Sequence, residues 1–268
     1  MSGQTPWVNP VRASLASGQP AFGITITTRS VEAAAHAATL GFHFLWVEME
    51  HSPVTLETLR LMVLASRGLP AAVFARVPVV ELWTAKRVLD QGVSGVIFPF
   101  IGNAEQAATA AAACRYPPKG KRGSGAGAAV RTWPVAGNYY DSADEHVMTI
   151  CVVEEARALD QIDAIAATPG IDAIFIGTSD LSFSLGLRGK QDEPALDSAI
   201  RTIADAARRH GKFLGRPAGS AEQVRRFMDQ GFLLFQLATE IGFMEMGAKQ
   251  ILEPLGIAGL PASERALY

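Results

Sequence analysis

The chain has 268 residues, of which 49% are hydrophobic and 19% charged, and its formal net charge at pH 7 is −2. The near-neutral charge gives no electrostatic reason to expect a nucleic acid or an anionic membrane as partner. No apolar run approaches the roughly 20 residues that a membrane span requires.

The chain begins without the continuous apolar core of a signal peptide. Its two cysteines, Cys114 and Cys151, are too few for a disulfide framework and match no zinc spacing. We therefore expect both to be reduced and buried, in a cytoplasmic protein.

Short apolar runs alternate with helix-like segments along the whole chain. The expected strands span residues 21–27, 42–49, 71–77, 95–100, 147–154, 172–177, 212–216 and 232–238. Several segments between them begin with Ser, Thr or Asn and end on Gly, as helices do. Nearly apolar strands, each followed by a helix, indicate a parallel sheet covered on both faces.

Eight such units are the number found in a (β/α)8 barrel. The alternative is a doubly wound open sheet, but no strand–GxGxxG–helix unit is present, since the Gly-rich stretch 120–127 follows a helix and a Tyr-Pro-Pro turn. No linker-like change of composition divides the chain. We predict an α/β fold, a single-domain TIM barrel over residues 1–268, with a long loop at 116–146.

A barrel carries its active site at the carboxyl ends of its strands, and several expected strands end in groups that can do chemistry. The candidates are Glu48, Glu50, His51, Arg76, Glu154, Thr178, Ser179 and Asp180. Ionisable groups beside apolar strands are costly to bury without partners, so this clustering indicates a site.

Glu154 and Asp180 could share a divalent cation, because hard oxygen ligands suit Mg²⁺ or Mn²⁺. The alternative for both is helix capping, since each precedes an expected helical turn. Arg76 alone could neutralise an acid, and His51 alone could be a structural hydrogen-bonding group. A Schiff-base mechanism needs a lysine at the end or in the interior of a strand, and none of the lysines fits.

Several stretches together point to a known family. They are NPVRASLASGQPAFG, EMEHSP, ARV, KRVLDQGVSGVIFP, CRYPPKGKRG, VVEEA and GIDAIFIGTSDLS, which follow one another over nearly the whole chain. In these stretches the chain resembles the metal-dependent class II pyruvate aldolases of the HpcH/HpaI family.

The resemblance implies a TIM barrel that holds Mg²⁺, Mn²⁺ or Co²⁺ through Glu154 and Asp180. It implies that pyruvate chelates the metal, that the peptide N–H groups around Ser179 and Asp180 bind its carboxylate, and that Gly177, Thr178 and Ser179 form the substrate-binding segment. Arg76 would stabilise the enolate oxygen, and His51, oriented by Glu48, would act as the base. The enolate of the 2-oxo acid would then add to an aldehyde, or the reverse reaction would break the carbon–carbon bond.

The resemblance also implies a homo-oligomer, a hexamer or trimer, in which C-terminal helices are exchanged. Glu81 would complete the site of the neighbouring subunit. Glu50 is left with a weaker assignment, a contact to a water on the metal or to a residue that itself binds in the site. We expect no nucleic acid and no membrane as partner.

The chain departs from the family pattern at Val152, Thr178 and Ser179, and in strand seven it offers Arg216 where the family tends to be apolar. One hypothesis places Arg216 at the mouth of the barrel, binding an anionic group of the acceptor; the alternative is a surface salt bridge. We expect Lys121, Arg122 and Arg131 to be solvated or to lie between subunits.

The predicted function is a metal-dependent carbon–carbon lyase acting on pyruvate or a close 2-oxo acid. Oxaloacetate decarboxylation and cleavage of a 3-hydroxyacyl-CoA thioester remain alternatives on the same barrel. A catalytically idle binding barrel is the alternative of a different class.

Overall fold

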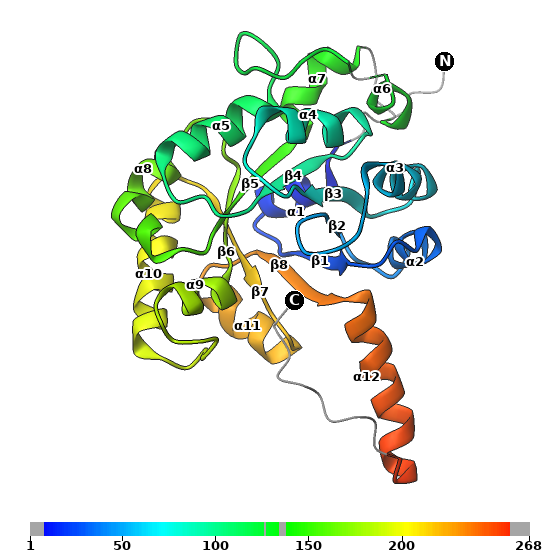
Figure 1. Ribbon diagram of the computed structural model, residues 1–268, viewed down its shortest axis with the longest axis vertical. Helices are drawn as coiled ribbons and strands as arrows, with labels where there is room; N and C mark the ends of the chain where they lie inside the picture. The colour runs from blue at the N-terminus through cyan, green and yellow to red at the C-terminus, as the bar shows by residue number, and fades with distance from the viewer. Residues whose placement is uncertain (1–7, 126, 134–137, 258–268) are drawn as a thin grey trace.

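Eight parallel strands close into a barrel in the order β1 to β8, surrounded by helices (Figure 1). The computed structural model describes residues 8–125, 127–133 and 138–257. The strands are β1 (Ala21–Ile26), β2 (Phe44–Glu48), β3 (Ala72–Arg76), β4 (Gly95–Phe98), β5 (Met148–Val153), β6 (Ala173–Ile176), β7 (Phe213–Pro217) and β8 (Leu234–Thr239). The predicted (β/α)8 barrel is confirmed, and each expected strand agrees with the observed one to within two residues at either end.

Helices follow the strands and cover the outside of the barrel. They are α1 (Pro10–Ala16), α2 (Val31–Ala37), α3 (Leu56–Ala65), α4 (Leu82–Asp90), α5 (Ala104–Cys114), α6 (Ala129–Thr132), α7 (Tyr139–His146), α8 (Ile162–Ala167), α9 (Thr178–Ser184), α10 (Pro194–Arg209), α11 (Ala221–Asp229) and α12 (Glu240–Leu252), with 3-10 turns η1 (Ala156–Gln161) and η2 (Glu253–Leu255).

Side-chain caps set where many of these helices begin, as the sequence indicated. Each capping oxygen accepts a backbone N–H of the first turn, which would otherwise lack an intrahelical partner. The capping residues are Asn9, Ser30, Thr55, Asn103, Asn138, Ser220 and Thr239. Helix α9 is among the helices that begin without a side-chain cap, and it starts directly after Gly177.

Aromatic side chains fill the inside of the barrel. Phe44 and Phe74 pack with ring centres 5.2 Å apart, and Trp46 meets the edge of Phe175 at 5.0 Å. Small residues make room for these rings, since a Cβ on Gly23 would lie 2.3 Å from the Phe44 ring. These rings make the lower part of the barrel a packed core.

The long loop before β5 joins α5 to the start of a strand, so it lies at the end of the barrel opposite the carboxyl ends of the strands. Within it Arg122 is 2% exposed. Its guanidinium lies 4.6 Å from the ring centre of Tyr116, donates to the Tyr139 hydroxyl at 3.0 Å and pairs with Asp90 at 3.7 Å. The expectation that Arg122 is solvated or intersubunit surface is wrong for this subunit, because these partners hold the charge inside the loop.

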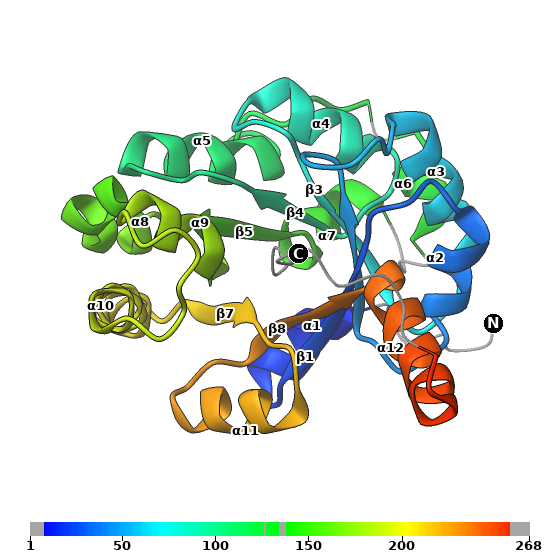
Figure 2. The same cartoon turned by 60° about the horizontal axis from the view of Figure 1, so that its bottom comes forward.

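Helix α12 extends away from the barrel (Figures 1 and 2), and its first turn lies near the segment after α2, where the rings of Phe42 and Phe243 have centres 5.8 Å apart. None of its residues is buried. Its exposed apolar side chains include Ile241, Phe243, Met244, Met246 and Ile251. Of the helices in the described ranges, none has both the length and the apolar character needed to cross a bilayer.

Candidate active site

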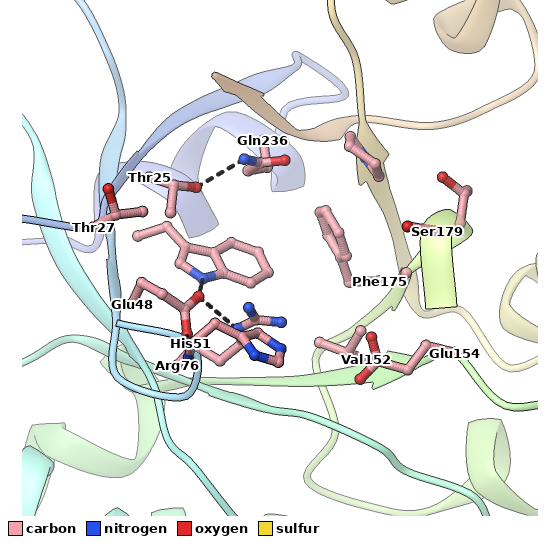
Figure 3. A pocket seen from close by; sticks show the side chains of 14 residues that line it. Thr25, Thr27, Glu48, His51, Arg76, Val152, Glu154, Phe175, Ser179 and Gln236 are labelled. Atoms are coloured by element: carbon pink, nitrogen blue, oxygen red, sulfur yellow. Dashed lines mark hydrogen bonds and ion pairs between the residues drawn. The ribbon is translucent and has the colours of Figure 1, made fainter. Parts of the chain in front are cut away.

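A pocket of about 130 Å³ opens at the carboxyl ends of the strands (Figure 3). The expected site residues that line it are Glu48, His51, Arg76, Glu154, Gly177, Thr178 and Ser179. They come from the ends of β2, β3, β5 and β6, which lie far apart in the sequence. The closed barrel brings them together.

Glu48, the last residue of β2, is at the centre of a hydrogen-bond network. Its Oε2 accepts from Arg76 Nε at 2.6 Å and from Trp46 Nε1 at 3.3 Å. Its Oε1 accepts from the backbone N–H groups of Glu50 and His51, at 2.7 and 3.1 Å. The chain turns after Met49 as expected, and the Ser52 hydroxyl fixes the turn by donating to the Glu48 carbonyl.

Arg76 is held between two acids at the end of β3. Besides its bond to Glu48, its Nη1 lies 3.1 Å from Glu50 Oε2, and the Arg76 side chain is only 4% exposed. The guanidinium carbon is 5.8 Å from the Trp46 ring centre. A buried guanidinium needs such partners, and together they fix its position at the wall of the pocket.

His51 stands at the rim of the pocket, with its side chain 52% exposed. Its Nε2 lies 3.6 Å from Glu50 Oε2. Glu48 therefore orients the His51 backbone, while Glu50 is the acid beside the imidazole ring. Burial raises the pKa of Glu50, although Arg76 and His51 act in the opposite direction.

Glu154 follows β5 and is 1% exposed. Its Oε1 accepts the backbone N–H of Phe100 at 2.8 Å, and Phe100 has a left-handed φ of 51°. Burial is the largest cause that raises the pKa of Glu154 to about 7. The capping alternative does not describe this residue, because the following turn η1 starts after Glu155 and the Glu154 carboxylate is directed at Phe100 instead.

Gly177 allows α9 to begin directly against Glu154. A Cβ on Gly177 would lie 2.4 Å from Glu154 Oε2, so any side chain here would displace the carboxylate. Asp180 lies in the first turn of α9. Burial raises the pKa of Asp180, while His51 and Arg76 lower it, and Asp180 in turn raises the pKa of Glu154. The two acids are thus within electrostatic reach of each other.

Four of the predicted residues are not among those that line this pocket, namely Glu50, Asp180, Glu81 and Arg216. Glu50 and Asp180 adjoin it through the interactions described above, whereas the other two lie elsewhere. Glu81 is exposed just before α4, where its carboxylate accepts from Trp83 Nε1. Arg216 is part of β7, and its side chain points outwards to α11, where its guanidinium carbon lies 3.5 Å from the ring centre of Phe227. Burial lowers the pKa of Arg216 to about 10. This placement, away from the barrel mouth, does not support a contact of Arg216 with an acceptor in this subunit.

Sequence reasoning missed the residues that complete the pocket wall. They are Thr25, Thr27, Trp46, Phe175, Pro217 and Gln236. Trp46 and Glu48 are two residues apart in β2 and therefore point to the same face of the strand. This alternation of side chains could have assigned Trp46 to the inner face from the sequence. The face of Gln236 could not be assigned in this way. The pairing of β8 with β1 shifts by one residue at a bulge between Gly23 and Ile24, next to Gln236, and the sequence does not reveal this shift.

Comparisons with known proteins agree with this geometry. The family model of the HpcH/HpaI aldolase/citrate lyase family matches residues 23–245. The chain belongs to this family. Its relatives include a hydroxypyruvate/pyruvate aldolase of Paraburkholderia phytofirmans, 33% identical over 92% of this chain and 97% of that protein. A 5-keto-4-deoxy-D-glucarate aldolase of Klebsiella pneumoniae is 30% identical over 91% of this chain and 96% of that protein.

A solved structure of an HpcH/HpaI family protein has the same fold as this chain. The family protein from Burkholderia cenocepacia superposes with a TM-score of 0.85 at 29% identity, covering 93% of this chain and 100% of its own. The predictions of the HpcH/HpaI family and of a carbon–carbon lyase of the aldolase type are confirmed. The alternatives of a decarboxylase, a thioester lyase or an idle barrel gain no comparable support from these relatives.

Proposed function

We propose that this HpcH/HpaI enzyme is a divalent-metal-dependent aldolase that forms the enolate of pyruvate or a close 2-oxo acid and joins it to an aldehyde. The observation that carries the proposal is one pocket lined by a buried acid, a buried guanidinium and an accessible imidazole, namely Glu154, Arg76 and His51. Proton removal beside a carbonyl needs a base, charge stabilisation at the oxygen and a fixed substrate.

The donor set of Glu154 and Asp180 fits a hard divalent cation such as Mg²⁺, Mn²⁺ or Co²⁺. Burial raises the pKa of both acids, and the charge of Asp180 further raises the pKa of Glu154, which a cation held by the two carboxylates would relieve. The described residues contain no cluster of three or more His, Cys, Asp or Glu side chains arranged to hold a metal. Substrate oxygens and water would therefore supply the remaining ligands. A bound cation supplies Lewis acidity at the keto oxygen.

Arg76 would stabilise the negative charge that develops on the keto oxygen when the methyl proton leaves. Glu48 and Glu50 hold its guanidinium in place before substrate binds, so little reorganisation is required during the reaction. The backbone N–H groups at Thr178 and Ser179 would bind the substrate carboxylate, because the first turn of a helix leaves such groups without intrahelical partners.

His51 would accept the methyl proton at an imidazole nitrogen. The Glu50 carboxylate lies 3.6 Å from Nε2 and would stabilise the imidazolium that forms. The exposure of the ring at the rim also allows the proton to be returned to solvent or to the product.

We further propose that the enzyme works as a homo-oligomer, a hexamer or trimer in which α12 packs on neighbouring subunits. The support is the exposed apolar surface of α12, with Met244 72% and Ile251 66% exposed. Val79, Leu82 and Trp83 expose a second apolar surface around Glu81. Glu81 would be brought to a neighbouring pocket by this assembly.

Exchange of the pyruvate methyl protons with deuterium tests the proposal before any acceptor is known. Protein supplied with Mn²⁺ or Mg²⁺ should exchange the methyl protons. Protein treated with EDTA should not exchange them until Mn²⁺ or Mg²⁺ is added back. Full exchange in metal-free protein would refute a metal-dependent mechanism. Retro-aldol cleavage of 4-hydroxy-2-oxo acids, assayed with the same metals, tests the carbon–carbon step.

A further inference from the structure

The side of the pocket across from Arg76 and Glu154 carries a polar pair with no part in the proposed chemistry. Gln236 on β8 and Thr25 on β1 both line the pocket, and they are 7% and 4% exposed. The Gln236 amide donates through Nε2 to Thr25 Oγ1 at 2.9 Å. Figure 3 shows this pair on the side of the pocket opposite Arg76 and Glu154, with Phe175 between Gln236 and Glu154.

The pair retains hydrogen-bonding capacity after this bond. An amide has two N–H donors and an acceptor oxygen, and a hydroxyl has one donor besides its lone pairs. One bond uses a single N–H of Gln236 and a lone pair of Thr25, so within the described part of the chain the Thr25 hydroxyl hydrogen and the Gln236 carbonyl oxygen are still available. The carbonyl oxygen points away from Thr25 (Figure 3). Thr27 differs, since its hydroxyl contacts both carboxylate oxygens of Glu240 at 3.3 Å.

The surroundings of the pair make this capacity selective. Trp46, Phe175 and Pro217 form the neighbouring wall. An alkyl group placed here would leave buried donors and acceptors unsatisfied, which costs more than the bonds alone are worth. A hydroxyl group, which both donates and accepts, would satisfy the pair.

Position assigns the pair to the acceptor. In the proposed function, the carboxylate and keto oxygen of the 2-oxo acid lie at the Arg76 and Glu154 side. The aldehyde adds to the methyl carbon, so its substituents extend towards the other side of the pocket. We infer that Gln236 and Thr25 select acceptor aldehydes that carry a hydroxyl group over alkyl aldehydes. This inference rests on the proposed function and specifies its acceptor class.

Glycolaldehyde and acetaldehyde test this selection, because they differ by one hydroxyl group. With pyruvate and Mn²⁺, the wild-type enzyme should show a kcat/KM for glycolaldehyde at least about tenfold above that for acetaldehyde. Gln236→Leu and the near-isosteric Thr25→Val should each reduce this ratio by about tenfold. A purely structural role would lower both rates together and leave the ratio unchanged, which would overturn the inference.

Two controls separate the ways in which the inference can fail. Gln230→Leu changes an exposed glutamine beyond α11 and should keep the wild-type ratio. In Gln236→Leu, the rate of deuterium exchange of hydroxypyruvate is divided by that of pyruvate and compared with the same ratio in the wild-type enzyme. If this ratio changes as much as the ratio for the two aldehydes, the pair contacts the 2-oxo acid instead of the aldehyde, and the inference is wrong. If the wild-type enzyme exchanges the methyl protons of pyruvate but does not prefer glycolaldehyde, only the inference is contradicted. If it never exchanges these protons, the proposed function is contradicted as well.

Discussion

Arg76 Nε donates to Glu48 Oε2 across 2.6 Å, and both side chains are 4% exposed. The bond joins the ends of β2 and β3, whose residues 48 and 76 are also direct partners in the sheet register. Because Glu48 also accepts two backbone N–H groups, a single carboxylate fixes both the guanidinium and the turn that carries His51.

Arg76→Lys should therefore retain a positive charge but lose the planar geometry that fits two acids at once. We expect pyruvate exchange to fall by about 100-fold, the range seen when one charge-stabilising donor is removed. Arg76→Ala should also lower the stability by about 3 kcal/mol, because Glu48 would be left buried without its cation. Proton NMR of pyruvate in D2O and urea unfolding measure the two effects. Arg225→Lys on the exposed face of α11 is the control; an equal loss of exchange there would contradict the assignment.

Glu154→Gln should abolish Mn²⁺ binding and metal-dependent exchange, because the neutral amide is a much poorer ligand and the site has few protein donors. Titration calorimetry with Mn²⁺ measures the binding. Glu155→Gln is a matched control, since Glu155 is adjacent in sequence but pairs with Arg157 at 2.7 Å outside the pocket. Undiminished Mn²⁺ affinity in Glu154→Gln would place the metal elsewhere.

His51→Gln should reduce exchange by about 100-fold or more while leaving Mn²⁺ affinity within a small factor, because a glutamine cannot accept the proton. Glu50→Gln should have a smaller effect on exchange, since it removes only the charge beside the ring. His36→Gln, an exposed histidine on α2, is the control. Equal exchange rates in His51→Gln and His36→Gln would show that another group is the base.

Acidification should weaken the fold through His43. Its Nδ1 accepts the Phe22 backbone N–H at 3.2 Å, and burial lowers its pKa below the model-peptide value of 6.5. The unfolded chain therefore binds more protons than the folded one in the window just below pH 6.5, and stability falls as the pH falls through it. Urea unfolding at pH 7.5 and 5.5 measures this. His43→Gln should reduce the difference between the two pH values, and an unchanged difference would assign it to other groups.

Met244→Asp together with Ile251→Asp should dissociate the proposed oligomer, because charges would replace exposed apolar contacts of α12. Size-exclusion chromatography with light scattering measures the mass, and Ser198→Asp on the exposed face of α10 is the control. Exchange activity should fall with dissociation, since Glu81 would no longer reach a neighbouring pocket. A monomer with full activity would contradict the role of Glu81.

The sequence by itself determined the barrel and most of the candidate site. Period and composition separate strands from helices, and a closed parallel barrel always gathers the strand ends at one face. That rule is sufficient to group Glu48, His51, Arg76 and Glu154 from the sequence alone.

Only the tertiary structure decided which partner each side chain takes and which face of β7 lies towards the pocket. Arg216 belongs to a strand that reaches the pocket, yet it points outwards to Phe227, because neighbouring residues in a strand face opposite sides. Strict alternation would have put Glu50 and His51 on opposite faces, but the chain turns after Met49, and Glu50 Oε2 lies 3.6 Å from His51 Nε2. Gln236 and Thr25 are 211 residues apart, and only closure of β8 on β1 makes them a pair.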